Sequence, residues 1–297
     1  MSIYFTFILS FFFEICFKTG RVIITLYALK LGAQSFTVGA MAAMLSVLPT
    51  LLSWYAGKMA DRFGSRWLLM MGTAAGTFGM LAPYVLPGLP ALFFTSVMYG
   101  LLSTLSAAPV QNLVGLQSNP QDSAKNFSNL SLIFSFGSLA GPLLAGFSID
   151  HAGPDASCLG IALLSLVPAA MLVIWGSVLP RGSRAERHTG SFRILLSESE
   201  LWRVLVISSL VMTGVDLFQV FMPIYGYGIG LSASAIGIIL AICASAAFGV
   251  RFFLPSLTRR LSAKRVLAYS FLIGATGFLL VPFFKSIWIL NIYVMLA

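Results

Sequence analysis

Residues 57–66 read Gly-Lys-Met-Ala-Asp-Arg-Phe-Gly-Ser-Arg and separate two apolar stretches, 35–56 and 67–86. Each stretch is close to the length of about 20 apolar residues that a helix needs to cross a bilayer. The segment between them carries three basic residues and one acidic residue, and its two glycines permit a tight turn. This part of the chain therefore predicts two membrane helices that run in opposite directions and meet at a short basic loop.

The rest of the chain has the same membrane character. Of its 297 residues, 58% are hydrophobic and 9% are charged, and the mean hydropathy is +0.94. A soluble domain carries about 25% charged residues, so a water-soluble fold is excluded. The three cysteines are far apart and lie in apolar runs, which favours packing roles over disulfides or a metal site.

The sequence predicts an all-α membrane protein with about nine and a half transmembrane helices. The tenth span has only 11 residues before the chain ends, about 16 Å of helix against a bilayer core of about 30 Å. We therefore expect either a fragment or a gene that has lost its end. The expected spans are 3–28, 35–56, 67–86, 91–113, 127–149, 157–179, 203–227, 233–255, 266–284 and a tenth that begins near Ile287.

Basic residues set the expected orientation of these helices. One alternate set of loops holds 13 Lys and Arg residues and the other set holds two. Because basic loops stay in the cytoplasm during insertion, this distribution predicts a cytoplasmic N-terminus. It also accounts for most of the net charge of +9 without a nucleic-acid partner. The compact loops indicate a bacterial inner membrane, in which we expect a monomer surrounded by lipid.

The chain also repeats itself at an offset of 198 residues. The repeat predicts two parallel six-helix bundles, the second incomplete, with a substrate site between them near the bilayer midplane. Residues 1–180 would form the first bundle, 181–202 a cytoplasmic linker, and 203–297 a partial second bundle. The matching pairs are Tyr27 and Tyr225, Gly32 and Gly230, Gly39 and Gly237, Arg62 and Arg260, Leu69 and Leu267, Gly76 and Gly274, and Gly79 and Gly277.

The loop at 57–66 resembles the signature G-x-L-A-D-R-x-G-R-R/K of the major facilitator superfamily. The resemblance implies the fold of these transporters and makes the loop a cytoplasmic gate between the bundles. A solvated basic turn that only sets topology is the alternative. The second bundle carries a degenerate copy at 255–265. The residues assigned to the gate loop are Gly57, Asp61, Arg62, Gly64 and Arg66, with both glycines in the turn and both arginines at the aqueous interface.

The fifth predicted helix contains a pattern of small residues that resembles the G-x-x-x-G-P motif of antiporters in this family. Small residues four positions apart let helices approach closely, and proline bends a helix. Close packing alone is the alternative reading. The family's basic residue in helix 4 is missing, since no Lys or Arg occurs between Trp67 and Lys125. The motif comprises Gly137, Gly141, Pro142 and Gly146.

Charged residues inside the predicted spans are the candidates for substrate and proton coupling. Glu14, Lys18 and Arg21 share one face of the first helix because they recur at i, i+4 and i+7. A charge near the bilayer centre costs at least about 2.5–3.5 kcal/mol, so these groups require partners or water. An interfacial position is the alternative, if the helix begins later in the chain.

The seventh predicted helix supplies the matching polar groups. Asp216 and Gln219 lie on one face and are the repeat mates of Lys18 and Arg21. We expect a carboxylate, Asp216 or Glu14, to exchange protons while a basic residue competes for it, with a purely structural ion pair as the alternative. Arg251 is a further candidate near a helix end, from which its side chain can reach the interface.

These features predict a secondary active transporter that works by alternating access. The expected activity is proton-coupled efflux, by antiport, of a small and partly apolar organic solute or drug-like compound. The chain has no phosphate-binding loop and no hydrolase or metalloprotease motif, so we expect neither an enzyme nor a cofactor beyond the proton gradient. A uniporter or uptake symporter of a metabolite or sugar, and a truncated non-functional remnant, are the alternatives.

Overall fold

The computed structural model describes residues 2–179 and 199–245, which we call the first and second segments. Both segments are helical apart from short turns, so the prediction of an all-α protein is confirmed. The ninth and tenth predicted spans, Arg251, the loop copy at 255–265 and most of the predicted linker lie outside the described residues. The helices are α1 Ser2–Lys30, α2 Ser35–Phe63, α3 Ser65–Val85, α4 Leu89–Gln117, α5 Ser123–Trp175, the short 3-10 helix η1 Gly176–Val178, α7 Ser199–Gly228 and a final helix Ala233–Ser245.

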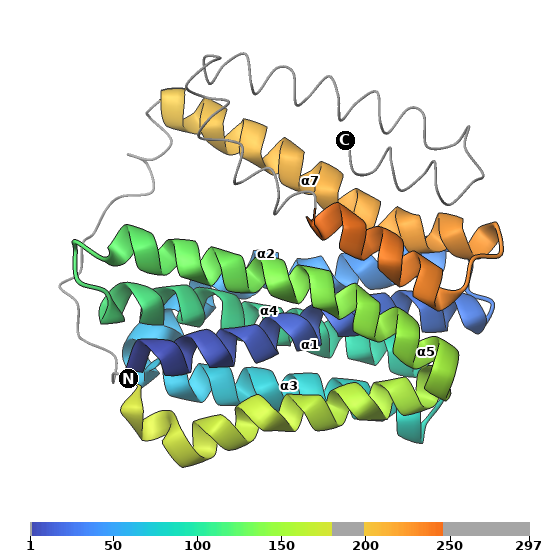
Figure 1. Ribbon diagram of the computed structural model, residues 1–297, viewed down its shortest axis with the longest axis horizontal. Helices are drawn as coiled ribbons and strands as arrows, with labels where there is room; N and C mark the ends of the chain where they lie inside the picture. Colours follow the sequence, from blue (N-terminus) through green and yellow to red (C-terminus); the bar gives the residue numbers. More distant parts are fainter. Residues whose placement is uncertain (1, 180–198, 246–297) are drawn as a thin grey trace.

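Helix α5 is the longest described element and covers the predicted span 127–149 and most of the next one, 157–179. Its 53 residues would extend about 80 Å if straight, far beyond a bilayer core of about 30 Å. The helix instead bends at Gly153, whose φ of +83° lies in the region that favours glycine. Figure 1 shows the chain reversing there and running back along the bundle.

Five helices in the described segments are long and apolar enough to cross a membrane. Their ends differ from those of the predicted spans by a few residues, because backbone hydrogen bonding can continue beyond the hydrocarbon core of the membrane. The loop predicted at 57–66 is in the structure a single turn at Gly64, with φ +84°, since α2 continues as a helix to Phe63 and α3 begins at Ser65. The five spans are Ser35–Ala60, Ser65–Val85, Leu89–Gln117, Ser123–Trp175 and Leu205–Gly228.

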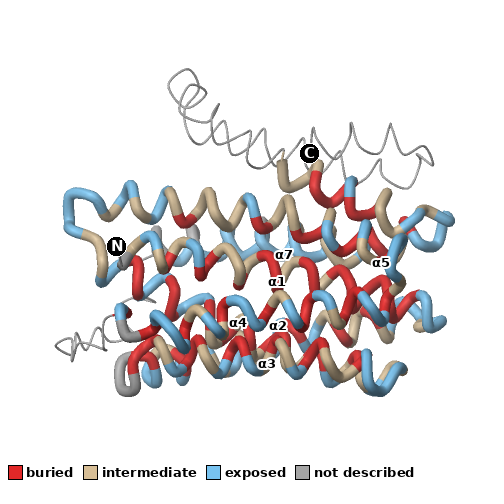
Figure 2. Tube along the Cα trace, turned by 60° about the horizontal axis from the view of Figure 1, so that its bottom comes forward, coloured by how far each residue is buried: buried red, intermediate tan, exposed pale blue. Residues whose placement is uncertain are grey.

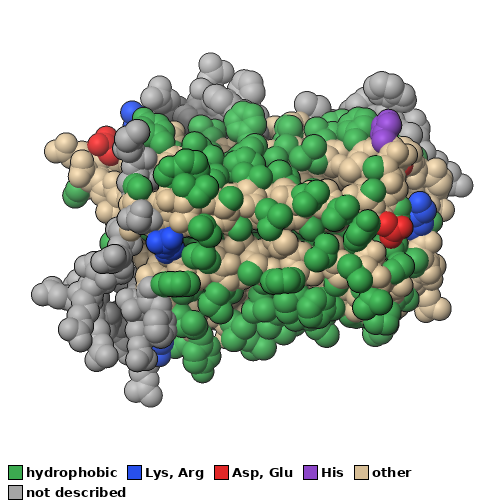
Figure 3. Space-filling view, turned by 90° about the horizontal axis from the view of Figure 1, so that it is seen from below, with side chains coloured by type: hydrophobic (Ala, Val, Ile, Leu, Met, Phe, Trp, Pro, Cys, Tyr) green, Lys and Arg blue, Asp and Glu red, His purple; other side chains and the backbone are tan. Residues whose placement is uncertain are grey.

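The helices run up and down between two polar ends. The basic end holds the turn at Gly64 and the turn before α5, with Lys58, Arg66 and Lys125 nearby. The opposite end holds the glycine turns at 32, 88, 153 and 230. Figure 3 shows charged side chains gathered at the two ends and a broad apolar band between them, as expected for a surface that contacts lipid.

Helix α1 lies at the centre of the first segment and packs against α4 and α5 (Figure 2). Leu9 and Ile23 on this helix are fully buried. Gly20 allows α1 to approach α4, because a Cβ at this position would overlap the ring of Tyr99 and lie 2.7 Å from the terminal methyl of Met80. The Tyr99 ring is fully buried and stacked on Phe17, so it has no free space to move into.

The turns after α1 and α7 have the same backbone structure at an offset of 198 residues. Gly32 and Gly230 both have φ +81°. Three hydrogen bonds close each turn, and every donor and acceptor in one turn has its counterpart 198 positions later in the other. In the first turn Leu31 donates to Tyr27, Gly32 to Leu29 and Ala33 to Ala28, and in the second Ile229 donates to Tyr225, Gly230 to Tyr227 and Leu231 to Gly226, all between 2.9 and 3.1 Å.

The packing of α1 on α4 predicts the effect of filling the space at Gly20. We expect Gly20→Ala to lower the free energy of unfolding by about 1–3 kcal/mol, because overpacking a filled core forces neighbours off their preferred positions. Gly39→Ala is the matched control, since nothing lies within 4 Å of its added Cβ. Thermal unfolding of the two purified variants in detergent measures the difference. Equal unfolding temperatures would contradict this account of the packing.

Candidate functional site

Arg21 of α1 makes the contact between the two described segments that involves the predicted coupling residues. Its Nη1 donates to Asp216 Oδ1 at 2.9 Å and to Gln219 Oε1 at 3.3 Å, and Nη2 donates to the backbone oxygen of Asp216 at 3.4 Å. The Arg21 side chain is 13% exposed, whereas that of Asp216 is 61% exposed. The guanidinium is therefore shielded, while the carboxylate that neutralises it remains accessible.

The position of this contact agrees with the internal repeat. Arg21 and Gln219 are 198 residues apart, which makes them mates in the repeat, and they are hydrogen-bonded to each other. Two equivalent residues related by a twofold axis can touch only if both lie beside that axis. The guanidinium is accordingly placed where two repeats related in this way would meet.

Lys18 pairs within its own helix and not across the segments. Its Nζ lies 3.8 Å from Glu14 Oε1, and both side chains are about 20% exposed. Of the two basic residues that we expected to compete for a carboxylate, Arg21 is therefore the one that contacts Asp216 in this structure. Lys18 lies about one turn before Arg21 along α1. At that position on the helix its partner is Glu14 and not Asp216.

The small residues of α5 provide the space for these charged side chains. An added Cβ at Gly137 would lie 2.5 Å from Glu14 Cγ, and one at Gly141 would lie 2.5 Å from Lys18 Cβ. The two glycines are four residues apart and face α1. The motif therefore does more than bring two helices together, because Gly137 and Gly141 leave room for the ionic pair of α1.

The Glu14 and Lys18 pair opens into a cavity of about 200 Å³ between α1, α4 and α5. Aromatic rings, serine hydroxyls and two small aliphatic side chains form the remainder of the wall. Two of these hydroxyls, Ser10 and Ser106, donate to carbonyls of their own helices, so toward the cavity they offer acceptors. The lining residues are Ser10, Phe13, Glu14, Phe17, Lys18, Ser103, Ser106, Ala107, Val110 and Phe134.

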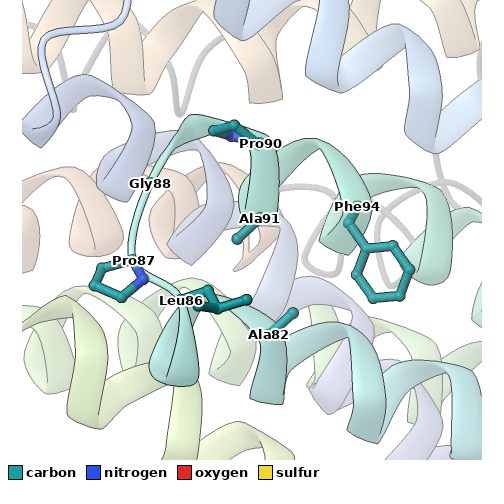
Figure 4. A pocket seen from close by; sticks show the side chains of 7 residues that line it. All are labelled: Ala82, Leu86, Pro87, Gly88, Pro90, Ala91 and Phe94. Atoms are coloured by element: carbon teal, nitrogen blue, oxygen red, sulfur yellow. The ribbon is translucent and has the colours of Figure 1, made fainter.

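A larger hollow of about 400 Å³ lies at the opposite end, where α3 turns into α4. Figure 4 shows its wall, with Ala82 and Leu86 on one side and Ala91 and Phe94 on the other. Its lining contains no charged or titratable side chain. We therefore place the candidate site at the smaller cavity, which has ionic groups.

The basic turn is organised differently from the predicted gate loop. Gly57 lies inside α2, which corrects its assignment to the turn. Arg66 is half-buried, and its Nη2 donates to the carbonyl of Val173 at 3.2 Å. Because the last carbonyls of a helix lack intrahelical donors, this guanidinium stabilises the end of α5 and is not simply held at the aqueous interface as predicted. The side chains of Asp61 and Arg62 lie outside the described residues.

Pro142 and Gly146 face the second segment, unlike the two glycines of α5 that face α1. A Cβ on Gly146 would overlap the carbonyl oxygen of Ala233, and one on Gly237 would overlap that of Pro142. Asp150, which sequence reasoning missed, lies on the same face and contacts the start of the helix Ala233–Ser245. Its spacing of four from Gly146 and eight from Pro142 was the available signal.

Comparison with known proteins places the chain in a family. The sequence model of the Major Facilitator Superfamily matches residues 4–297. The chain belongs to this superfamily. It is a multi-pass integral membrane protein of a transporter family, and these proteins are not enzymes. The fold expected from the loop signature is thus confirmed as that of the Major Facilitator Superfamily.

Its similarity to individual proteins is distant. The quinolone resistance protein NorA of Staphylococcus aureus is 24% identical over 275 residues, which cover 90% of this chain and 69% of that protein. The class B tetracycline resistance protein of Escherichia coli is 25% identical over 137 residues, covering 46% of this chain and 34% of that one.

Solved structures of two transporters share the fold of this superfamily member. The nucleoside transporter NupG has a TM-score of 0.74 at 15% identity, covering 100% of this chain and 77% of that one. A POT family transporter in complex with 5-aminolevulinic acid has a TM-score of 0.76 at 14% identity, covering 99% and 80%.

The contact of Gly141 with α1 predicts a loss of stability when a side chain is added. We expect Gly141→Ala to lower the free energy of unfolding by about 1–3 kcal/mol, because its Cβ would press on Lys18 and on the backbone nitrogen of Thr19 at 3.0 Å. Gly160→Ala in the same helix is the control, since nothing lies within 4 Å of its Cβ. Denaturation followed by tryptophan fluorescence compares the two. A Gly141→Ala protein as stable as its control would refute the proposed seating of α1.

Proposed function

We propose that this protein exports a small, partly apolar organic solute in exchange for protons, by alternating access between two bundles. The observation that carries the proposal is the contact of Arg21 with Asp216 and Gln219 across the two described segments. It joins a permanently charged guanidinium to a carboxylate, which is a group that can gain or lose a proton.

The exposure of the two partners supports a coupling role. The Asp216 side chain is 61% exposed, whereas Arg21 is shielded and keeps its charge as a guanidinium. Protonation of Asp216 would remove one charge of the ion pair and weaken the link between the segments. Proton binding would thereby lower the barrier to movement of one segment against the other, which is the coupling that an antiporter requires.

The cavity beside Glu14 and Lys18 is the proposed contact surface for the solute. Phe13, Phe17 and Phe134 supply an apolar wall, and the loosely paired ions supply charge. Such a lining suits a solute that has an apolar body and at least one charged or polar group. The relatives named as quinolone and tetracycline resistance proteins support a drug-like compound as the substrate class.

The remaining assignments complete the proposal. We infer that residues 1–180 and 203–297 form the two bundles, joined by 181–202, and that the basic end faces the cytoplasm of a bacterium in its inner membrane. We further propose that the protein acts as a monomer. Asp61 and Arg62 would act in the cytoplasmic gate, and Arg251 would be an additional coupling candidate.

Asp216 is the residue on which this proposal is tested. We expect Asp216→Asn to lose at least about tenfold in the uphill accumulation of ethidium by inverted vesicles under an imposed pH gradient, because its side chain cannot accept a proton to become neutral. Downhill movement of ethidium should persist. Asp122→Asn is the control, since Asp122 is exposed in the turn before α5 and its side chain makes no capping hydrogen bond.

Two outcomes would contradict the proposal. Uphill accumulation by Asp216→Asn equal to that of the control would exclude this carboxylate as the coupling group. Accumulation by the parent protein that is unchanged when the pH gradient is collapsed would favour the uniporter alternative over antiport.

A further inference from the structure

Asp150 closes a second contact between the two segments, at the opposite end of the bundle. Its Oδ2 accepts a hydrogen bond from the backbone N–H of Ser234 at 2.7 Å, and its Oδ1 accepts one from Ala233 at 3.2 Å. These donors are at the first positions of the helix Ala233–Ser245, where N–H groups have no partner within the helix. A carboxylate there is favoured both by hydrogen bonding and by the helix dipole.

The backbones beside Asp150 are as close as backbones without side chains permit. Gly146 faces the carbonyl of Ala233 and Gly237 faces the carbonyl of Pro142, with no room for a Cβ at either glycine. Ser234 Oγ also donates to the Gly146 carbonyl, at 3.4 Å. The carboxylate thus lies at the outer end of a tight seam, which we define as Pro142, Gly146 and Asp150 against residues 233–237.

The seam is closed while the part of α7 near the basic end is exposed. Leu210 and Met212 of α7 are 63% and 64% exposed, whereas Met222, ten residues nearer the opposite end, is 3% exposed. Figure 1 shows the first turns of α7 well separated from α1 and its last turns close to the first segment. The hydrogen bonds and close backbone contacts of the seam thus lie at the opposite end.

We propose that Asp150 is a gating residue, whose contact with the start of the helix Ala233–Ser245 holds the opposite end shut and must break when the transporter opens there. The proposal rests on alternating access as the proposed function. At Gly146 and Gly237 no side chain separates the two backbones, so the two segments can part there only by breaking these contacts. The exposed position of Asp150 lets water replace them, which makes the contact reversible.

This role is distinct from the proton coupling proposed for Asp216. Asp150 lies three residues before the bend of α5 at Gly153, between the two predicted spans of this helix, 127–149 and 157–179. Burial acts to raise its pKa, but hydrogen bonds from Ser234 and Ala233 outweigh burial and lower it. The carboxylate therefore stays ionised near neutral pH, and the contact is lost only in acid, as the pH falls through this lowered pKa.

The experiment measures how often the opposite end opens. Spin labels on cysteines introduced at Leu86 and Tyr227, which are 72% and 43% exposed, report the distance between the segments there by double electron–electron resonance in nanodiscs. The three native cysteines are replaced. We expect Asp150→Ala to raise the population with the longer distance about 2- to 30-fold, the range that corresponds to loss of a helix cap. Asp150→Asn should give an intermediate rise.

Matched controls separate this contact from general damage to the fold. Asp122→Ala removes a carboxylate next to a helix start where it makes no capping bond, and should leave the distances unchanged. Gly146→Ala forces the seam apart without touching the carboxylate and should also raise the longer-distance population, whereas Gly160→Ala should not. If Asp150→Ala fails to fold, Asp150→Asn and Gly146→Ala still decide the question.

The outcomes distinguish this proposal from the proposed function. Distances in Asp150→Ala and Gly146→Ala that equal those of their controls would overturn the gating role. The measurement requires neither solute nor proton gradient, so it can succeed even if Asp216→Asn shows that coupling occurs elsewhere. Conversely, if Asp216 proves to be the coupling group but the Asp150 and Gly146 variants show unchanged distances, only the gating role of Asp150 would be rejected.

Discussion

Ionised side chains within an apolar band must be neutralised, and much of the described structure follows from this requirement. Helix α1 carries three such groups on one face, and each charge near the bilayer centre costs at least about 2.5–3.5 kcal/mol if it is left alone. Glu14 and Lys18 neutralise each other, and Arg21 reaches across to α7. These side chains need space as well as partners of opposite charge. Helix α1 therefore lies against the glycines of α5, in the centre of the first segment.

Helix α5 connects the two kinds of contact. One of its faces, at Gly137 and Gly141, seats the charged side chains of α1, and the adjacent face, at Pro142, Gly146 and Asp150, meets the second segment. Residues 141 and 142 are consecutive, and one residue corresponds to about 100° around a helix. A movement of the second segment would therefore act on the same helix that supports the ionic groups. The proposed gate and the candidate cavity are thus built on the same helix.

The two copies of the internal repeat share the backbone structure of their turns but differ in how far their side chains are buried. The turns after α1 and α7 share hydrogen bonds and glycine geometry at the offset of 198 residues. Yet Tyr27 of α1 is 3% exposed and donates a hydrogen bond to Asp155, whereas α7 is exposed over much of its length. Local structure follows from local sequence, which the two copies share. Burial depends on what surrounds each helix, and that is not the same in the two described segments.

The loop at 57–66 carries the resemblance to the family. The sequence by itself also determined the membrane class, most helix positions and the face that Glu14, Lys18 and Arg21 share. These features follow from composition and from a period of 3.6 residues, both of which are local properties. Only the tertiary structure decided that Arg21 and not Lys18 meets Asp216, that Gly57 is helical, that Arg66 contacts the end of α5, and that Asp150 caps the helix Ala233–Ser245. Periodicity gives the face of a helix but not its height or rotation against a partner. A contact between residues as far apart as 21 and 216 depends on both, and these are set by how glycines and side chains pack.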